Sequence, residues 1–353
     1  MCRWDIWVRE GFISPCRTTL IKCQIAQQRR QNSNTIRSLR AGPPATADAE
    51  TFLNVPVANP LAGQLAPASA YNGATIATGQ LLRPYPQFAN ITNMGSNLGS
   101  SNYESLQASY QKRFGAVGVF MASYTWAKVI GTVDTATVFL ESSSVGAIQD
   151  YNNLRADRSI ESFDVPQRLV LNYTAALPFG KGQKVLGDAN RTVSAIVSGW
   201  KVSGITSFQS GFPVAMAAAT NALASNYGAG TIRPNYVAGC NRTIGGSAGS
   251  RVTNGEWFNT ACFQQPGPFS FGNEGRVDST IRSQGVDNWD LSVARDVAIR
   301  ERLHLSFEGE FLNAFNRIQF GSPGSQLGST TFGVVTSQSN NPRQIQFALR
   351  LSF

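Results

Sequence analysis

The chain has one histidine, and the residues around it decide what chemistry that histidine could perform. Ser306 follows His304 two positions later, and Glu308 and Glu310 continue the same alternation. A histidine beside a serine can activate a hydroxyl nucleophile, and paired carboxylates can serve general acid–base catalysis. On an extended strand, however, residues i and i+2 lie about 7 Å apart, which is too far for a direct Ser–His hydrogen bond. We therefore interpret these four residues as polar side chains on one face of a strand, and we expect no catalytic site.

The five cysteines form two groups. Cys2, Cys16 and Cys23 lie near the N-terminus, whereas Cys240 and Cys262 lie 22 positions apart in a polar, glycine-rich segment. No C-x-x-C spacing occurs, so we expect no zinc site and no other metal or cofactor. In an oxidising compartment the second pair could form a disulfide that closes a loop, and the alternative is two free thiols.

The net charge of +9 is concentrated at the N-terminus. Residues 1–43 contain eight Lys and Arg residues against Asp5 and Glu10. A basic arm can bind nucleic acid or an anionic membrane surface, but this one lacks interleaved aromatic residues, so we expect no nucleic-acid partner. It also lacks the continuous apolar core and small-residue cleavage site of a signal peptide. We expect residues 1–45 to be a disordered segment foreign to the family, and residues 46–353 to be the folded domain.

The last eleven residues alternate between apolar and polar side chains. Ile345, Phe347, Leu349, Leu351 and Phe353 are apolar, and the residues between them are polar or small. Successive side chains of a strand point to opposite faces, so this segment has one apolar and one polar face. Taken alone, the pattern fits an amphipathic strand on a soluble core as well as the closing strand of an outer-membrane β-barrel.

The same alternation recurs along the chain. It predicts strands at 103–114, 117–128, 167–177, 196–210, 287–299 and 301–315. An eighth strand is expected at 77–92, although Pro84 and Pro86 weaken it. No apolar run is long enough for a transmembrane helix, and only 14% of the residues are charged.

The lengths of the connections distinguish the two interpretations. Links near 114–117 and 299–301 are short and the link at 178–195 is moderate, whereas those at 129–166, 211–286 and 316–342 are long. Bacterial barrels alternate in this way between short periplasmic turns and long outer loops, whereas a soluble sandwich has no such rule. We therefore expect an all-β, antiparallel transmembrane β-barrel segment that supplies about seven or eight strands of a larger barrel.

Aromatic residues gather near the expected strand ends, where they suit the interfacial girdles of a barrel. The alternative is that they reflect the general preference of strands for aromatic residues. They are Tyr110, Phe114, Tyr124, Trp126, Trp200, Phe208, Trp289 and Phe315.

Eleven short motifs occur in order across residues 52–353. They are QLLRPYPQF at 80–88, NYESLQ at 102–107, ASYTWAK at 122–128, FDVPQR at 163–168, LPFGK at 177–181, GWKVSG at 199–204, QSGFP at 209–213, WFNT at 257–260, NWDL at 288–291, FLNAFN at 311–316 and PRQIQ at 342–346. With these motifs and the terminal Phe353, the chain resembles the C-terminal barrel portion of TonB-dependent outer-membrane receptors. More narrowly, it resembles the Oar-like receptors of Acidobacteria.

The resemblance implies uptake of an extracellular ligand across the cell outer membrane, with outer-membrane lipid and the barrel-assembly machinery as partners. Such receptors carry a lumenal plug and a TonB-contacting segment before a barrel of about 22 strands. We find neither feature in this sequence, so we expect a fragment that engages the TonB system only through a missing N-terminal part. Phe347, Leu349, Leu351 and Phe353 would then form the terminal assembly signal.

Two other functions remain open for this chain. A small autonomous barrel could act as an adhesin or a passive pore, and it would close without further strands. A soluble secreted β-protein could use Cys240 and Cys262 as a staple, and it would stay in solution without detergent.

Overall fold

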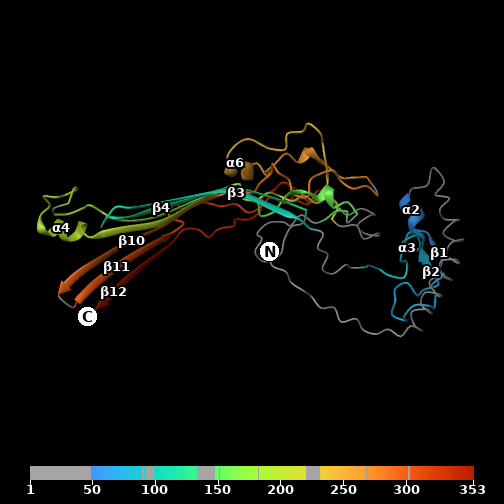
Figure 1. Ribbon diagram of the computed structural model, residues 1–353, viewed down its shortest axis with the longest axis horizontal. Helices are drawn as coiled ribbons and strands as arrows, with labels where there is room; N and C mark the ends of the chain where they lie inside the picture. The colour runs from blue at the N-terminus through green and yellow to red at the C-terminus, as the bar shows by residue number, and fades with distance from the viewer. Residues whose placement is uncertain are drawn as a thin grey trace. The chain divides into compact units, whose positions relative to one another are not determined.

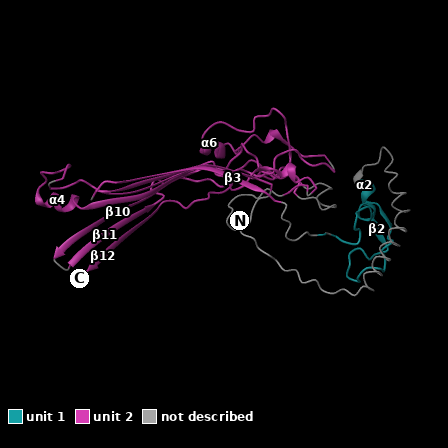
Figure 2. Ribbon diagram, in the orientation of Figure 1, with its two compact units in different colours: residues 1–94, 226–228 teal, residues 95–225, 229–353 magenta. Residues whose placement is uncertain are grey.

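The computed structural model describes residues 49–89, 91, 99–115, 117–132, 148–150, 152–181, 183–219, 231–267, 269–300 and 303–353. The basic segment expected at 1–45, with Cys2, Cys16 and Cys23, lies outside the described residues. The chain forms two compact units, one comprising residues 1–94 and 226–228 and the other the rest (Figure 2).

The first unit is small and contains short elements only. They are α2 (Ala49–Asn54), β1 (Pro56–Ala58), β2 (Thr75–Ala77) and α3 (Thr78–Leu81). β1 and β2 pair antiparallel as a two-stranded sheet. The strand expected at 77–92 is wrong, because the chain turns into α3 at Thr78. The backbone N–H and the hydroxyl of Thr78 both donate to the carbonyl of Val55, and Leu81 is buried behind them.

The second unit is built on an antiparallel sheet of long strands (Figure 1). They are β3 (Ser101–Arg113), β4 (Gly118–Gly131), β6 (Gln167–Ala176), β7 (Trp200–Gln209), β10 (Val286–Arg300), β11 (Leu303–Leu312) and β12 (Gln344–Ser352). Their order in the sheet is β12-β11-β10-β7-β6-β4-β3, and the short β5 (Ser159–Ile160) also pairs with β4. Each long strand therefore lies beside its predecessor in sequence. The other seven expected strands and the all-β fold class are confirmed.

The pairing register places most of the apolar side chains of the seven long strands on one side of the sheet, which we call the apolar face. Opposite partners across successive strands include Leu349 with Phe307, Val293 with Val202, and Tyr124 with Leu169. Arg295 and Thr206 also lie on this face. Its apolar and glycine members include Leu106, Ala108, Tyr110, Phe120, Ala122, Tyr124, Trp126, Leu169, Leu171, Tyr173, Ala175, Trp200, Val202, Gly204, Phe208, Trp289, Leu291, Val293, Val297, Leu305, Phe307, Gly309, Phe311, Ile345, Phe347, Leu349 and Leu351.

The alternate residues form the opposite, polar face. Its members include Gln107, Ser109, Gln111, Ser123, Thr125, Arg168, Asn172, Thr174, Lys201, Ser203, Ser207, Asp290, Ser292, Asp296, His304, Ser306, Glu308, Glu310, Gln346, Ala348 and Arg350. The expected register of the terminal strand is confirmed, because Ala348 pairs with Glu308 and Leu349 with Phe307.

The apolar face is exposed to the surroundings rather than packed on a core. Leu349 is 69% exposed, and Phe347, Trp126 and Leu106 also lie open. A contiguous apolar surface of this extent is unfavourable in water and marks an interaction site. A soluble sandwich would instead bury one face of each sheet. None of the helices in the described part of the chain is long and apolar enough to cross a membrane.

The connections at the two ends of the sheet differ. At the end that carries the C-terminus, β3–β4 and β10–β11 are joined by short turns, and β6–β7 by a segment that contains α4 (Arg191–Val197) (Figure 1). At the other end the described parts of the long connections form what we call the loop layer, residues 148–150, 152–166, 210–219, 231–267, 269–285 and 313–343. It contains η1 (Leu154–Asp157), β8 (Asn235–Tyr236), α6 (Ala248–Thr253), η2 (Thr260–Cys262) and β9 (Phe263–Gln264).

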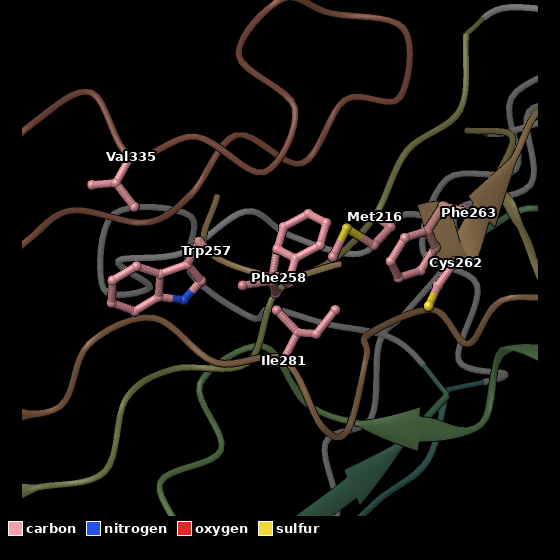
Figure 3. Close-up of a cluster of buried hydrophobic side chains, with 8 residues drawn as sticks. Met216, Trp257, Phe258, Cys262, Phe263, Ile281 and Val335 are labelled. Carbon is pink, nitrogen blue, oxygen red and sulfur yellow. The ribbon is translucent and has the colours of Figure 1, made fainter. Parts of the chain in front are cut away.

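The loop layer has a hydrophobic core of its own (Figure 3). Phe258 lies at its centre and meets Phe263 and Phe332 edge-on, with ring centroids 5.7 and 5.2 Å apart. The buried members of this core are Val214, Met216, Trp257, Phe258, Cys262, Phe263, Ile281 and Val335. The largest hydrophobic cluster of the described residues thus lies among the connections, and the strands below it carry their apolar side chains outward.

Candidate functional site

His304, Ser306, Glu308 and Glu310, the four residues considered above for acid–base chemistry, all lie on the polar face of β11. The Ser306 hydroxyl donates to Oδ1 of Asp296 on the neighbouring strand at 2.6 Å. His304 lies opposite Ala298 and Ser352, near the short-turn end of the sheet. Glu308 and Glu310 follow on the same face. The serine is thus engaged by a carboxylate, and the four residues form part of a polar lining.

The four residues of the expected assembly signal lie at or beyond the end strand of the sheet. β12 pairs with β11 on one side, and among the described strands it has no neighbour on the other. The ring of Phe347 covers Gly309 and lies 5.9 Å from the Phe307 ring. Leu349 and Leu351 continue along the apolar face, and Phe353 is 98% exposed. The segment expected to act as the assembly signal therefore has an open strand edge and an exposed apolar side.

Aromatic rings on the apolar side include a group near each end of β7, with Tyr173 and Phe311 between them. Near the loop layer, Trp289 lies between Phe208 and Phe315, with centroid distances of 5.7 and 5.4 Å. Near the short turns, Trp200 meets Phe307 at 5.8 Å. Trp200 and Phe208 lie at opposite ends of β7, about 26 Å apart along an extended strand. This spacing matches a tilted strand crossing the apolar part of a bilayer, with an aromatic girdle at each interface.

A disulfide joins Cys240 and Cys262, whose Cα atoms are 5.5 Å apart. Cys262 is fully buried in the core of the loop layer, and Cys240 packs against the same core. The backbone around Cys240 is held as well, because the Tyr236 hydroxyl donates to its carbonyl at 2.7 Å. The bond therefore closes the glycine-rich part of the longest connection onto the loop-layer core.

Buried ion pairs connect segments of the loop layer that are far apart in sequence. Arg276 is completely buried and donates to Oε2 of Glu161 at 3.0 Å. The same guanidinium donates to the carbonyls of Asp157 and Gly131 at 2.9 and 3.2 Å. One side chain thus joins the longest connection to the end of β4 and to the segment that follows it.

Two more pairs repeat this arrangement. Arg233 lies 2.7 Å from Asp157, and Arg282 lies 2.6 Å from Asp164. Burial lowers the pKa of Arg233, and the charge and hydrogen bond of Asp157 oppose that shift. Breaking a buried pair by removing one partner costs about 3–5 kcal/mol, because the other charge stays buried and unpaired. These contacts therefore fix the connections to one another and to the sheet.

Arg242 serves two carboxylates at once. Its Nη1 lies 3.0 Å from Glu274 and 2.6 Å from Asp278, and its guanidinium stacks 3.6 Å above the Tyr236 ring. Burial alone would lower the pKa of Arg242, but Asp278 and Glu274 outweigh it and raise the pKa. Burial, followed by the charge of Asp278, raises the pKa of Glu274, although Arg242 acts against this.

A polar groove of about 400 Å³ lies where the polar face meets the loop layer. Arg168 and Asp290 are its charged residues, and amide side chains supply most of its other polar groups. Asp290 accepts hydrogen bonds from the Asn313 backbone and the Asn288 amide, both at 2.9 Å, so its carboxylate is held in place. Such a lining can donate and accept hydrogen bonds with a polar solute.

Residues that could hold a metal ion do not converge in the described part of the chain. No group of three or more His, Cys, Asp or Glu side chains there has the arrangement of a metal site. The buried carboxylates of the loop layer pair with arginines instead. The chemistry that this region offers is hydrogen bonding and charge complementarity.

A family model described as outer membrane beta barrel domain matches residues 30–346, beginning upstream of the boundary expected at residue 46. No curated protein matches the chain. Among solved structures, it is similar to the outer membrane transporter YddB from Escherichia coli, with 10% sequence identity and a TM-score of 0.33. The match covers 72% of this chain and 25% of that one, so the chain spans about a quarter of the transporter's length.

Proposed function

Because the chain belongs to the outer membrane beta barrel domain family, we propose that it is the barrel portion of a TonB-dependent transporter of the Oar-like type. Family membership implies an outer-membrane location. The apolar face would contact lipid, the polar face would line the lumen, and the loop layer would face the exterior. No catalytic step is part of this proposal.

The observation that carries the proposal is the division of the sheet into two faces. The strands pair so that the alternation of side chains is in phase across all seven of them. One side of the sheet is therefore mainly apolar and exposed, and the other side is mainly polar. A lipid-facing side and a water-filled lumen need this arrangement in every strand. The unequal connections at the two ends support the orientation, with short turns in the periplasm.

The loop layer and the polar groove are the best candidates for ligand contact. Surface loops are usually mobile. The conformation of this layer, in contrast, is held by a hydrophobic core, a disulfide and buried ion pairs. A fixed surface binds with a smaller loss of conformational freedom than a mobile one. We propose that the loop layer contacts an extracellular ligand, and that the groove beneath it receives polar parts of that ligand.

The TonB system would act through a plug and a TonB-contacting segment. The described residues of the second unit form the long-stranded sheet and its connections, and these do not account for a plug. Energised uptake is therefore proposed for a protein that contains both parts. Reading the DNA upstream of the codon for Met1 tests this: a plug-coding frame there is expected, and an unrelated gene ending directly upstream would contradict the proposal.

The barrel-assembly machinery is the proposed partner of β12. Deletion of Phe353 from the chain, expressed with an added signal sequence, should lower the amount of protein in the outer membrane because an apolar end of the open strand is lost. Synthesis should be unchanged, as measured by pulse labelling. Deletion of Met1 is a control that leaves the strand intact. Normal membrane levels without Phe353 would count against this partner.

A further inference from the structure

The connection between β6 and β7 carries apolar side chains that are exposed although they lie outside the sheet. Ile196 on α4 is 62% exposed, and Val193 lies on the same side of this short helix. Val185 and Leu186 are also exposed in the turn that precedes it. Leu186 adopts a φ of 57°, a left-handed conformation that is unfavourable for a residue with a side chain of this size. In water, the exposed apolar side chains and the left-handed conformation of Leu186 would both be unfavourable.

Contacts with the sheet place α4 on the apolar side. The Trp200 indole N–H donates to the Ile196 carbonyl at 2.9 Å, and Nη1 of Arg295 donates to the same oxygen at 2.7 Å. Nη2 of Arg295 donates to the Ala195 carbonyl. Arg295 lies opposite Trp200 and Phe307 in the register, so it belongs to the apolar face. The helix is therefore held against the surface that faces lipid, at the short-turn end of the sheet.

Arg295 indicates the depth at which this contact lies. A charge on the lipid side of a barrel strand is costly at the middle of the bilayer and nearly harmless at the interface. Arg295 directs its charge to the last carbonyls of α4, the negative end of the helix, and its guanidinium lies 5.6 Å from the Trp200 ring. Both the arginine and the tryptophan are thus placed as interfacial residues.

Most of the charged residues around α4 are basic. Lys181, Lys184 and Arg191 are exposed in the same connection, with Asp188 as the carboxylate among them. Amphipathic segments that lie in a membrane interface combine apolar side chains on one side with Lys and Arg toward the headgroups. Anionic headgroups attract such cations within a short distance of the membrane surface.

We propose that α4 and the turn at 183–189 form an interfacial anchor that binds the phospholipid surface at the short-turn rim. Ile196, Val193 and Leu186 enter the boundary between headgroups and acyl chains, and the basic residues contact lipid phosphates. The anchor continues the apolar face past the end of β7. This inference rests on the lipid-facing role of the apolar face, which is part of the proposed function.

The test measures the depth of labels on the full chain. Cys2, Cys16 and Cys23 are replaced by Ser, and the disulfide is left intact. An environment-sensitive fluorophore is attached after Ile196→Cys, in the matched control Asp188→Cys, or on the sheet after Leu349→Cys. The protein, together with any further strands that the upstream DNA encodes, is refolded in vesicles of phosphatidylethanolamine and phosphatidylglycerol. Quenching by spin-labelled lipid is then compared with quenching by iodide in the water.

We expect lipid to quench the label at 196 more strongly than iodide does, and the reverse for the label at 188. The label at 349 reports on the sheet. If 349 is quenched by lipid while 196 behaves like 188, the anchor is overturned and the lipid-facing sheet stands. If iodide dominates at 349 as well, the proposed membrane role fails and the anchor fails with it.

Arg295→Gln provides a second variant, in which Arg295 acts as a positioning residue. Its loss should release the end of α4, so iodide access to the label at 196 should rise while the label at 349 stays unchanged. A general folding defect would raise iodide quenching of both labels. Unchanged access at 196 in this variant would contradict the role assigned to Arg295.

Discussion

Leu349 and Ala348 are neighbours on β12 that point to opposite faces of the sheet. Leu349→Arg should destabilise the membrane-inserted protein by about 1 kcal/mol, because it places a charge on the lipid side in the register of Phe307 and Arg295, toward the interface. Ala348→Arg should be nearly neutral, because the new side chain enters the polar face opposite Glu308. Denaturant titrations of the two variants in vesicles measure both effects. Equal losses at the two positions would refute the assignment of the faces.

Gly131 lies where the end of β4 meets the ion pair of Glu161 and Arg276. A Cβ atom at this position would overlap Oε1 of Glu161 and lie 2.8 Å from the Ser100 carbonyl oxygen. Gly131→Ala should therefore displace the carboxylate and destabilise the loop layer by about 1–3 kcal/mol. Hydrogen exchange of amides in residues 157–164 measures the loss.

Gly249→Ala is the matched control for this prediction. A Cβ at Gly249 has no atom within 4 Å, and the residue lies in α6. Alanine there should leave the exchange at 157–164 unchanged and stabilise the helix by up to about 1 kcal/mol. Faster exchange at 157–164 in this control would show that the effect at Gly131 is not specific to the ion pair.

The face of the sheet on which each strand residue lies could be predicted from the sequence, but the partners in the ion pairs could not. A strand face follows from an alternation that is local and visible in a few residues. The pair between Arg276 and Glu161 spans 115 positions, and the pair between Arg233 and Asp157 spans 76. The one signal was compositional: segments 155–168 and 274–282 are rich in both signs of charge in a chain that is otherwise poor in charge.

At the scale of elements, the disulfide defines how the longest connection is held. We expect the bond between Cys240 and Cys262 in exported protein, and its reduction should destabilise the loop layer by about 3 kcal/mol in the chain-entropy picture. The sheet should be unaffected, because the bond joins two points of the loop-layer core. Intact-mass analysis after alkylation measures the thiols, and two alkylated thiols at these positions would contradict the prediction.

The elements also differ in how well their sequences define them. The long strands were predictable because apolar and polar residues alternate over most of the length of each strand. Residues 77–92 were predicted wrongly, because a short alternating run at Thr75–Ala77 is followed by a helical turn at α3. α4 was missed as well: its seven residues lie within a connection, and its place depends on Arg295, which lies about a hundred positions later.

At the scale of the whole molecule, the direction of the strands limits how the sheet can close. Neighbours in the sheet are antiparallel throughout, so β3 and β12, the first and last of seven long strands, run in the same direction. Joining these two edges would create a parallel pair. Bacterial outer-membrane barrels have an even number of antiparallel strands. An antiparallel closure therefore requires an odd number of further membrane-spanning strands.

The described part of the first unit does not supply such strands, because β1 and β2 have three residues each and a crossing needs about 9–11. We therefore expect the isolated chain, refolded in detergent, to migrate on a gel at the same position with and without heating. A compact form that migrates faster before heating would contradict this, and it would favour an autonomous barrel that acts as an adhesin or a pore. If the upstream DNA encodes further strands, the extended protein is the control: it should show the heat-dependent shift that the isolated chain lacks, because its additional strands can pair with the open edges of β3 and β12.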